Sequence, residues 1–248
     1  MSNKISFLAA TLLTAGAALM ASPAQAVTFH YDWTEADGLY ENGQKVLSVN
    51  DRQGDYDAVS VSYDDNSSLL SWSSSFTQVG NHQIDGGWLV LSDGPNPKQH
   101  DKEFAIFYLD ASDVNDTKLT AYAYNGQNSS NSWKSNEFLG SWDNAIQVED
   151  NGDERTISFE LDASGLNAAD VSDSWKGAQF GENIGIWFHA GNRTNAEYNA
   201  DGSLSSFNTK AAWFDNTKAM ETTAVPEPMT TAGLALMGGV FFARRRKG

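Results

Sequence analysis

The amino-acid sequence predicts an all-β protein, most simply an antiparallel two-sheet sandwich of jelly-roll type, with a closed barrel as the alternative. Three observations lead to this fold class. Apolar and polar residues alternate in several segments, turn-forming dipeptides separate the apolar runs, and only one short segment favours a helix. We expect about a dozen strands in one domain without internal repeats.

The expected strands fall into two groups. Residues 27–33, 59–63 and 157–161 alternate with a period of two, which indicates strands with one face on the core and one in solvent. Residues 87–93, 104–110 and 185–191 are apolar on both faces and are expected to be central strands covered on each side. A further strand is expected over 119–125, where small Ala alternates with bulky Tyr.

Pairs of Asn or Asp with Gly mark the expected connections, because these residues tolerate positive φ. They occur at 42–43, 93–94, 125–126, 151–152 and 201–202. The only helix expected is a short one over residues 166–177. Pro95 and Pro97 share a single loop, so prolines leave the strands of the domain free to pair.

The N-terminal segment has the three parts of a secretory signal peptide. Lys4 precedes an apolar stretch over residues 5–20, and Ala24 and Ala26 form an A-x-A cleavage site. Cleavage is expected to leave Val27 as the new N-terminus after passage through the Sec translocon. The chain contains no cysteine, so the exported domain is expected to be stable without disulfides, as a domain of this size can be.

The C-terminal segment also has three parts. Pro226, Glu227 and Pro228 form a stiff, charged tripeptide, because both prolines fix φ and keep the preceding residue extended. Residues 229–243 are apolar, and as a helix they span about 22 Å against a hydrocarbon core of about 30 Å. Four basic residues follow and are expected to stay on the cytoplasmic side: Arg244, Arg245, Arg246 and Lys247.

These three parts, in this order at the C-terminus, resemble the PEP-CTERM sorting signal of Gram-negative bacteria. The resemblance covers roughly the last 24 residues. It implies a transient membrane span, recognition and cleavage near the tripeptide by exosortase, and release or attachment at the cell surface, often alongside exopolysaccharide. The alternative is a simple membrane anchor in which the tripeptide is only a stiff spacer.

The middle of the chain is similar to segments of many exported PEP-CTERM proteins, whose ectodomains look like concanavalin-type jelly rolls. The similar segments are "GGWLVLSDGPNPKQHDKEFAIFYLD", "YAYNGQNSSNSW" and "GIWFHAGNRTNAEYNADGSLSSF". The resemblance implies a concanavalin-like sandwich without an assigned activity. The expected organisation is a signal peptide (1–26), a β-sandwich domain (27–218), a spacer (219–225) and the sorting signal (226–248).

Charge restricts the expected partners. All 32 Asp and Glu residues lie between Asp32 and Glu227, whereas five of the 16 Lys and Arg residues lie in the tails. The segment between the tails therefore carries 11 positive and 32 negative side chains, a formal charge of −21. Such a surface repels the phosphate backbone, so we expect no nucleic-acid partner. Basic polymers or divalent cations would be attracted.

Motifs for catalysis and metal binding are missing or incomplete. Thiolate chemistry is excluded, and no G-x-S-x-G, H-E-x-x-H or phosphate-binding loop is present. Residues 149–154 approach the E-x-D-x-x-E pattern of some sandwich-fold glycosidases, but Asn151 replaces the central Asp, and Asn151-Gly152 predicts a hairpin turn. Acidic loops at 51–57, 110–116 and 149–154 leave calcium open, although none has the order of a known calcium loop.

Carbohydrate binding is the most specific function that the sequence suggests for the domain. Trp133 and Trp142 flank a loop rich in Asn and Ser that begins at Asn125, so flat apolar faces lie beside amide and hydroxyl partners. The alternative is that both indoles fill the ends of the sandwich. We therefore expect a non-enzymatic exported surface or matrix protein without a cofactor; the alternatives are a lectin-like module and a polysaccharide-acting hydrolase or lyase.

Overall fold

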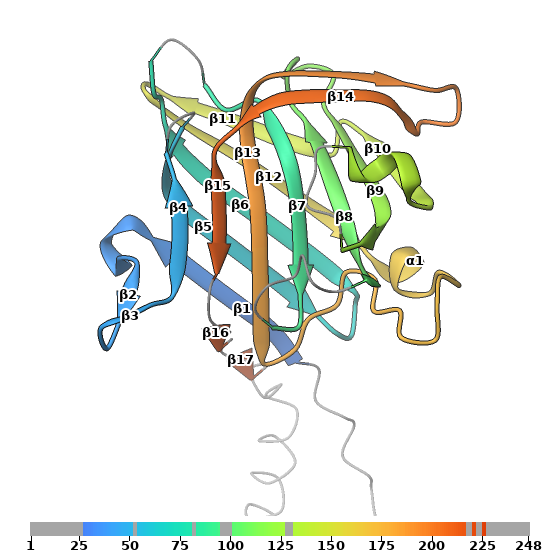
Figure 1. The fold of residues 1–248 in the computed structure, drawn as a ribbon, viewed down its shortest axis with the longest axis horizontal. Helices are drawn as coiled ribbons and strands as arrows, with labels where there is room; N and C mark the ends of the chain where they lie inside the picture. Colours follow the sequence, from blue (N-terminus) through green and yellow to red (C-terminus); the bar gives the residue numbers. More distant parts are fainter. Residues whose placement is uncertain are drawn as a thin grey trace, which may run out of the picture.

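The computed structural model describes residues 27–51, 54–80, 83–94, 101–126, 131–216, 220–221 and 225–226. Two antiparallel sheets pack face to face (Figure 1), which confirms the predicted all-β class. One sheet has six strands, in the order β11 (Ile146–Asn151), β12 (Glu154–Asp162), β6 (Leu69–Thr77), β5 (Asp55–Asp64), β1 (Val27–Thr34) and β17 (Val225–Pro226).

The second sheet has nine strands. Its main path is β10 (Phe138–Asp143), β9 (Lys118–Asn125), β8 (Asp101–Asp110), β7 (Gly86–Ser92), β13 (Asn183–Tyr198), β15 (Trp213–Asn216) and β4 (Leu47–Asn50). Two more strands pair with β13, namely β14 (Leu204–Ala211) and β16 (Met220–Glu221). A small hairpin of β2 (Tyr40–Glu41) and β3 (Gln44–Lys45) lies apart, and the described helices are η1 (Glu35–Asp37), η3 (Ser132–Ser135) and α1 (Ser164–Asn167).

The main core lies between the two sheets and is formed by large aromatic side chains. Alternation along β6 turns Leu70, Trp72 and Phe76 inward, where each is at most 1% exposed. From the opposite sheet, the Phe188 ring meets the Trp72 ring edge-on with centroids 5.2 Å apart. Burial of such rings is the dominant stabilising contribution to a fold of this kind.

The Tyr56 hydroxyl ties the two sheets together through the core. It donates a hydrogen bond to the Phe188 carbonyl (3.2 Å) and accepts one from the Ala190 amide (3.1 Å), both on β13. Here β13 changes partner, because residues 187–188 pair with β15 and residues from 191 onward pair with β14. The hydroxyl thus satisfies two backbone groups at this junction, and burial raises its pKa.

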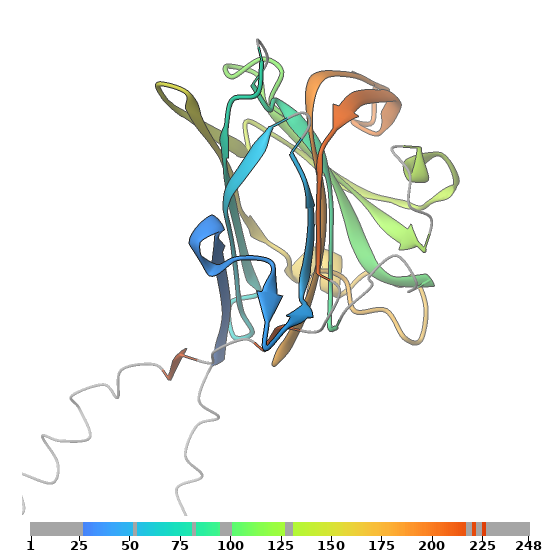
Figure 2. The ribbon, with the colours of Figure 1, turned by 60° about the vertical axis from the view of Figure 1, so that its left-hand side comes forward.

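A second hydrophobic cluster covers the outer side of the nine-stranded sheet. Strand β14 and the second half of β13 form an arm over this side, and Figure 2 shows the arm on the far side from the six-stranded sheet. The Phe207 ring of the arm meets the Tyr108 ring edge-on, with ring centroids 5.0 Å apart. This outer cluster consists of Trp88, Val90, Phe104, Ile106, Tyr108, Tyr122, Tyr124, Trp187, Leu204 and Phe207.

The outer cluster explains why several predicted strands are apolar on both faces. All seven residues of β7 are buried, and the first half of β13 is buried on both sides apart from its first residue and His189. The prediction of central strands at 87–93, 104–110 and 185–191 is confirmed by this double coverage. The returning arm covers part of the outer side, and Trp133 of η3 packs against the same cluster.

The predicted turns lie between strands, but the predicted helix is mostly wrong. Asn42 and Gly43 both take positive φ between β2 and β3, as a type I′ turn requires. Of residues 166–177, only the first two are helical, in the single turn of α1. The Trp175 indole donates to the Leu166 carbonyl (2.7 Å), and Asn167 bonds to the Tyr63 hydroxyl and the Ala178 amide, so tertiary contacts replace further helical bonds.

The two ends of the described domain lie side by side. Val27 begins β1 and pairs with Pro226 in β17, while Thr28 pairs with Val225. Strand β16 pairs with the start of β13. The segment expected as a spacer, 219–225, therefore contributes residues to short strands. Within the described ranges, no helix has the length and apolar character needed to cross a bilayer.

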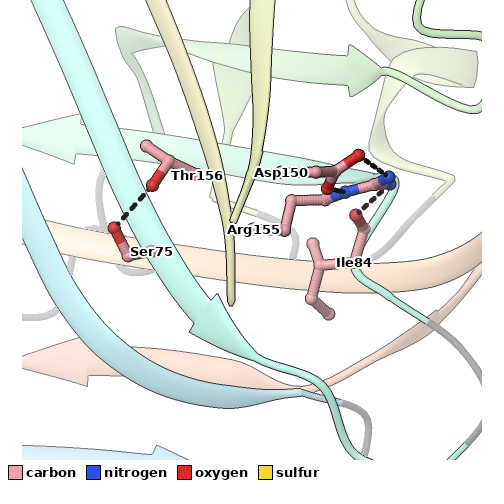
Figure 3. A network of polar contacts seen from close by, with 5 residues as sticks. All are labelled: Ser75, Ile84, Asp150, Arg155 and Thr156. Carbon is pink, nitrogen blue, oxygen red and sulfur yellow. Dashed lines mark hydrogen bonds and ion pairs between the residues drawn. The ribbon is translucent and has the colours of Figure 1, made fainter. Parts of the chain in front are cut away.

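Arg155 on β12 links Asp150 of β11 to the backbone of Ile84 (Figure 3). Its guanidinium makes two hydrogen bonds to the Asp150 carboxylate, at 2.6 and 2.8 Å, and a third to the Ile84 carbonyl at 3.1 Å. The Arg155 side chain is 12% exposed, so the pair is largely shielded on the arginine side. The bonds and the charge of Arg155 lower the pKa of Asp150.

The Tyr56→Phe variant is expected to lower the free energy of unfolding by about 1–3 kcal/mol, because it leaves the Ala190 amide and the Phe188 carbonyl unsatisfied in the core. Urea unfolding measures the change. Tyr40→Phe is the matched control, since Tyr40 is 65% exposed and its hydroxyl is free to bond with water. Equal unfolding midpoints for the two variants would contradict the bridging role of Tyr56.

The Asp150–Arg155 pair is expected to make stability depend on acid pH. The pKa of Asp150 is lower in the folded state, so its contribution is present above its ordinary value of 3.8 and is lost as the pH falls. Asp150→Asn should therefore destabilise the protein at pH 7 and have little further effect near pH 2. Urea titrations at both pH values, with Asp153→Asn as control, test this; a pH-independent difference would argue against it.

Candidate functional site

A hollow among the described residues lies on the outer side of the six-stranded sheet. Its volume is about 460 Å³, within the range of small-molecule sites. We call this surface the serine face and define it by Ser60, Ser62, Ser71, Ser73, Ser75, Thr156 and Ser158, from β5, β6 and β12. All of them except Ser75 line the hollow, together with Gln147, Glu149, Glu160, Trp72 and Phe159.

Strand register produces the hollow. Ser73 pairs with Ser60 on one side and with Ser158 on the other, so three small side chains form one row across the sheet. The next strands outward carry longer side chains, with Asp32 beside Ser60 on β1 and Gln147 beside Ser158 on β11. Small residues in the middle and long residues at the margins leave a depression between them. Neighbouring strands are about 4.8 Å apart, so this row is about 10 Å wide.

The hydroxyls of the hollow are available for a ligand. Of those that line it, only Thr156 has a hydrogen-bond partner among the described residues, and that partner is Ser75 at 2.9 Å (Figure 3). Each hydroxyl both donates and accepts, so the floor offers paired donors and acceptors at strand spacing. Trp72 and Phe159 border the floor, but both rings are buried on the inner side, and the floor presents no aromatic platform.

The surface around the hollow is strongly acidic. Arg155 is the only Lys or Arg in β1, β5, β6, β11 and β12, and it is bound to Asp150. The same strands carry Asp32, Asp55, Asp57, Asp64, Glu149, Asp150, Glu154, Glu160 and Asp162. Glu149 and Glu160 line the hollow itself and are exposed. The site therefore has a negative potential and a floor without charge.

A smaller hollow of about 220 Å³ lies beside η1, between β4 and β5. Glu35, Asp51 and Asp55 line it next to the buried indole of Trp33. Burial raises the pKa of Asp51, and the negative charges of Asp55, Glu35 and Asp57 raise it further, against a lowering by the Tyr56 amide. A carboxyl with a raised pKa can stay protonated at a pH at which neighbouring carboxyl groups are ionised.

A row of aromatic rings crosses the outer side of the nine-stranded sheet. The His189 ring stacks on the Trp88 ring, with ring centroids 4.5 Å apart and planes at 20°. The Trp213 ring centroid lies 6.3 Å from that of His189. Trp213 is 38% exposed, more than any other described tryptophan. The Trp88 Nε1 and the Tyr124 hydroxyl are buried in the outer cluster without a hydrogen-bond partner. The row is an apolar platform of modest exposed area.

The predicted carbohydrate residues do not come together. Trp133, in η3, packs against the outer cluster, and its backbone amide donates to the Tyr108 hydroxyl at 3.1 Å. Trp142, on β10, packs against the main core on the other side of the same sheet. Asn125 is the last residue of β9. The two indoles therefore cannot stack on one ligand together.

The acidic residues weighed for catalysis and calcium lie in loops and in the ends of the strands beside them. Residues 149–154 form the hairpin between β11 and β12, where Asn151 pairs with Glu154 and Gly152 takes a φ of +70°. Glu149 and Glu154 are both exposed, as the predicted turn required. No group of three or more His, Asp or Glu residues suited to a metal ion occurs in the described part of the chain. Asp113 and Asp110 instead accept bonds within their own loop.

The residues predicted for export and sorting lie largely outside the described ranges. These are Ala24, Ala26, Glu227, Pro228, Arg244, Arg245, Arg246 and Lys247. Val27 and Pro226 are described, and they face one another across β1 and β17.

Comparisons of the chain with protein-family models, with curated proteins and with solved structures find no match.

Sequence reasoning missed the serine face because it missed β6. Four serines and a threonine occupy nine residues of this strand, and such a composition is typical of a loop. The signal that could have identified it is the alternation of Leu70, Trp72 and Phe76 with Ser71, Ser73 and Ser75. The same alternation occurs in the predicted strands that became β5 and β12, where the serines again face outward.

Proposed function

We propose that this chain is an exported cell-surface or extracellular-matrix protein, delivered by an N-terminal signal peptide and a C-terminal PEP-CTERM signal that exosortase processes. A transient C-terminal span would hold the protein at the membrane before release or attachment. The domain between the signals would be a concanavalin-like jelly roll without enzymatic activity. The order of tripeptide, short apolar segment and basic end supports the sorting role.

The single structural observation that supports this proposal is the pairing of Val27 with Pro226. Strand β1 begins at Val27, the residue that signal cleavage would make the N-terminus, and the last described pairing is that of Pro226. Cleavage before Val27 and after Pro226 would therefore keep every described strand pairing. Val27 and Pro226 also lie at one edge of the six-stranded sheet.

Replacing Glu227 and Pro228 together by Ala is expected to abolish C-terminal processing in the native host. Pro226 stays in place, so the pairing of β17 with β1 is kept. Mass spectrometry of the protein from cells is expected to find a C-terminus near the tripeptide in the wild type and at Gly248 in the variant. Glu182→Ala, an exposed acidic residue elsewhere, is the control. A wild-type protein that stays intact to Gly248, or a variant processed normally, would refute the sorting role.

A second function, binding of polysaccharide, is favoured by the hollow on the serine face. Six hydroxyls, an amide and two carboxylates line it, and these groups match the hydrogen-bonding capacity of sugar hydroxyls. None of the lining residues is His, Lys or Cys, so the hollow lacks the usual base for a nucleophilic serine. Binding is the role proposed for this hollow.

Ser73→Leu is expected to reduce retention of the full chain on polysaccharide from the native host by tenfold or more. The leucine would fill the middle of the hollow and replace a hydroxyl by an apolar group, while the inward side chains of β6 stay unchanged. Ser205→Leu, at an exposed position of β14, controls for added hydrophobicity. Affinity electrophoresis measures the retention. Equal retention of both variants would remove the serine face as the site.

A further inference from the structure

The charge and the chemistry of the serine face together restrict the kind of polymer that fits it. This step rests on the second function proposed above, because it specifies the ligand of the same hollow. Glu149 and Glu160 reach it from β11 and β12, and neither has a cationic partner among the described residues. Asp32 extends the acidic margin on β1, where it is in contact with His30.

An anionic polymer is disfavoured by this arrangement. Its charges would meet Glu149, Glu160 and Asp32, with no Lys or Arg on the five strands except Arg155, which is already paired. A ligand bound mainly by stacking is disfavoured as well, because the rings of Trp72 and Phe159 are buried beneath the floor. The remaining ligands are neutral or cationic, and polar along their length.

The carboxylates favour a cationic ligand over a neutral one. An ammonium group provides the charge-assisted hydrogen bonds that an unpaired carboxylate accepts best. The floor between the carboxylates consists of hydroxyls, which match a chain rich in hydroxyls better than they match a lysine-rich peptide, whose side chains carry few of them. An amino sugar polymer combines both groups.

We propose that the serine face binds a polysaccharide with free amino groups, whose hydroxyls bond to the serines of β5, β6 and β12 and whose ammonium groups pair with Glu149 and Glu160. Ser60, Ser73 and Ser158 form the central row under the sugar chain. Glu149 lies on β11 beside Thr156, and Glu160 lies on β12 beside Ser71. The two carboxylates therefore flank this row.

The test compares probes that differ in charge. Isothermal titration of the full chain in detergent uses deacetylated chitosan oligosaccharide, the fully acetylated oligosaccharide of equal length, dextran and polylysine. Chitosan oligosaccharide is expected to bind at least tenfold more tightly than the acetylated form. Its affinity should fall as salt is raised, because exposed charge pairs are screened.

Substitutions on the serine face test whether the oligosaccharide binds there. Glu149→Gln combined with Glu160→Gln is expected to weaken chitosan binding about three- to thirtyfold, as two exposed ion pairs are lost. Glu137→Gln combined with Glu182→Gln removes the same charge from exposed positions away from this face and is expected to change the affinity less than twofold. Ser73→Leu should weaken binding of chitosan and leave binding of polylysine unaffected.

Each other outcome overturns the inference in a distinguishable way. Equal binding of acetylated and deacetylated oligosaccharide, unaffected by the Glu149 and Glu160 changes, would leave polysaccharide binding standing and remove the requirement for amines. Binding of polylysine alone would make the surface a site for basic peptides. Binding of no saccharide would overturn both this inference and the second function.

Discussion

Alternation along three neighbouring strands is the constraint on which both the core and the candidate site depend. In β5, β6 and β12, most of the side chains that face the opposite sheet are large and apolar, with Ser74 as an exception, and most of the outward residues between them are small and hydroxylated. A shift of register by one residue would place Trp72 in solvent and Ser73 in the core. The packing that stabilises the sandwich therefore also holds the serines in one outward array.

The nine-stranded sheet packs against the inner side of the strands that carry these serines. It is packed on both sides, by the main core and by the outer cluster under the arm of β13 and β14. The Tyr56 hydroxyl joins the sheets where β13 exchanges one partner for another, so the transition occurs without unsatisfied backbone groups. Because packing holds the backbone that carries the serines, ligand binding costs little backbone conformational entropy.

Much of the fold could be predicted from local pattern, and the site could not. Seven segments were expected as strands from alternation or continuous apolar character, and all of them lie in strands. The helix over 166–177 failed because Trp175 and Asn167 form tertiary hydrogen bonds, which local propensity does not report. The hollow needs β5, β6 and β12 to be neighbours, and the pairing of residues 80 positions apart cannot be inferred from one strand at a time. Trp133 and Trp142 are close in sequence, yet the sheet separates them.

The pairing of β17 with β1 has a mechanical consequence for a protein held by its C-terminal end. Pulling on that end would load only the two residue pairs between Val225–Pro226 and the start of β1, which would peel apart one after the other. The long ladders of β5, β6 and β12 lie deeper in the sheet and would bear little of the force. Loss of these two residue pairs would therefore leave the serine face unchanged.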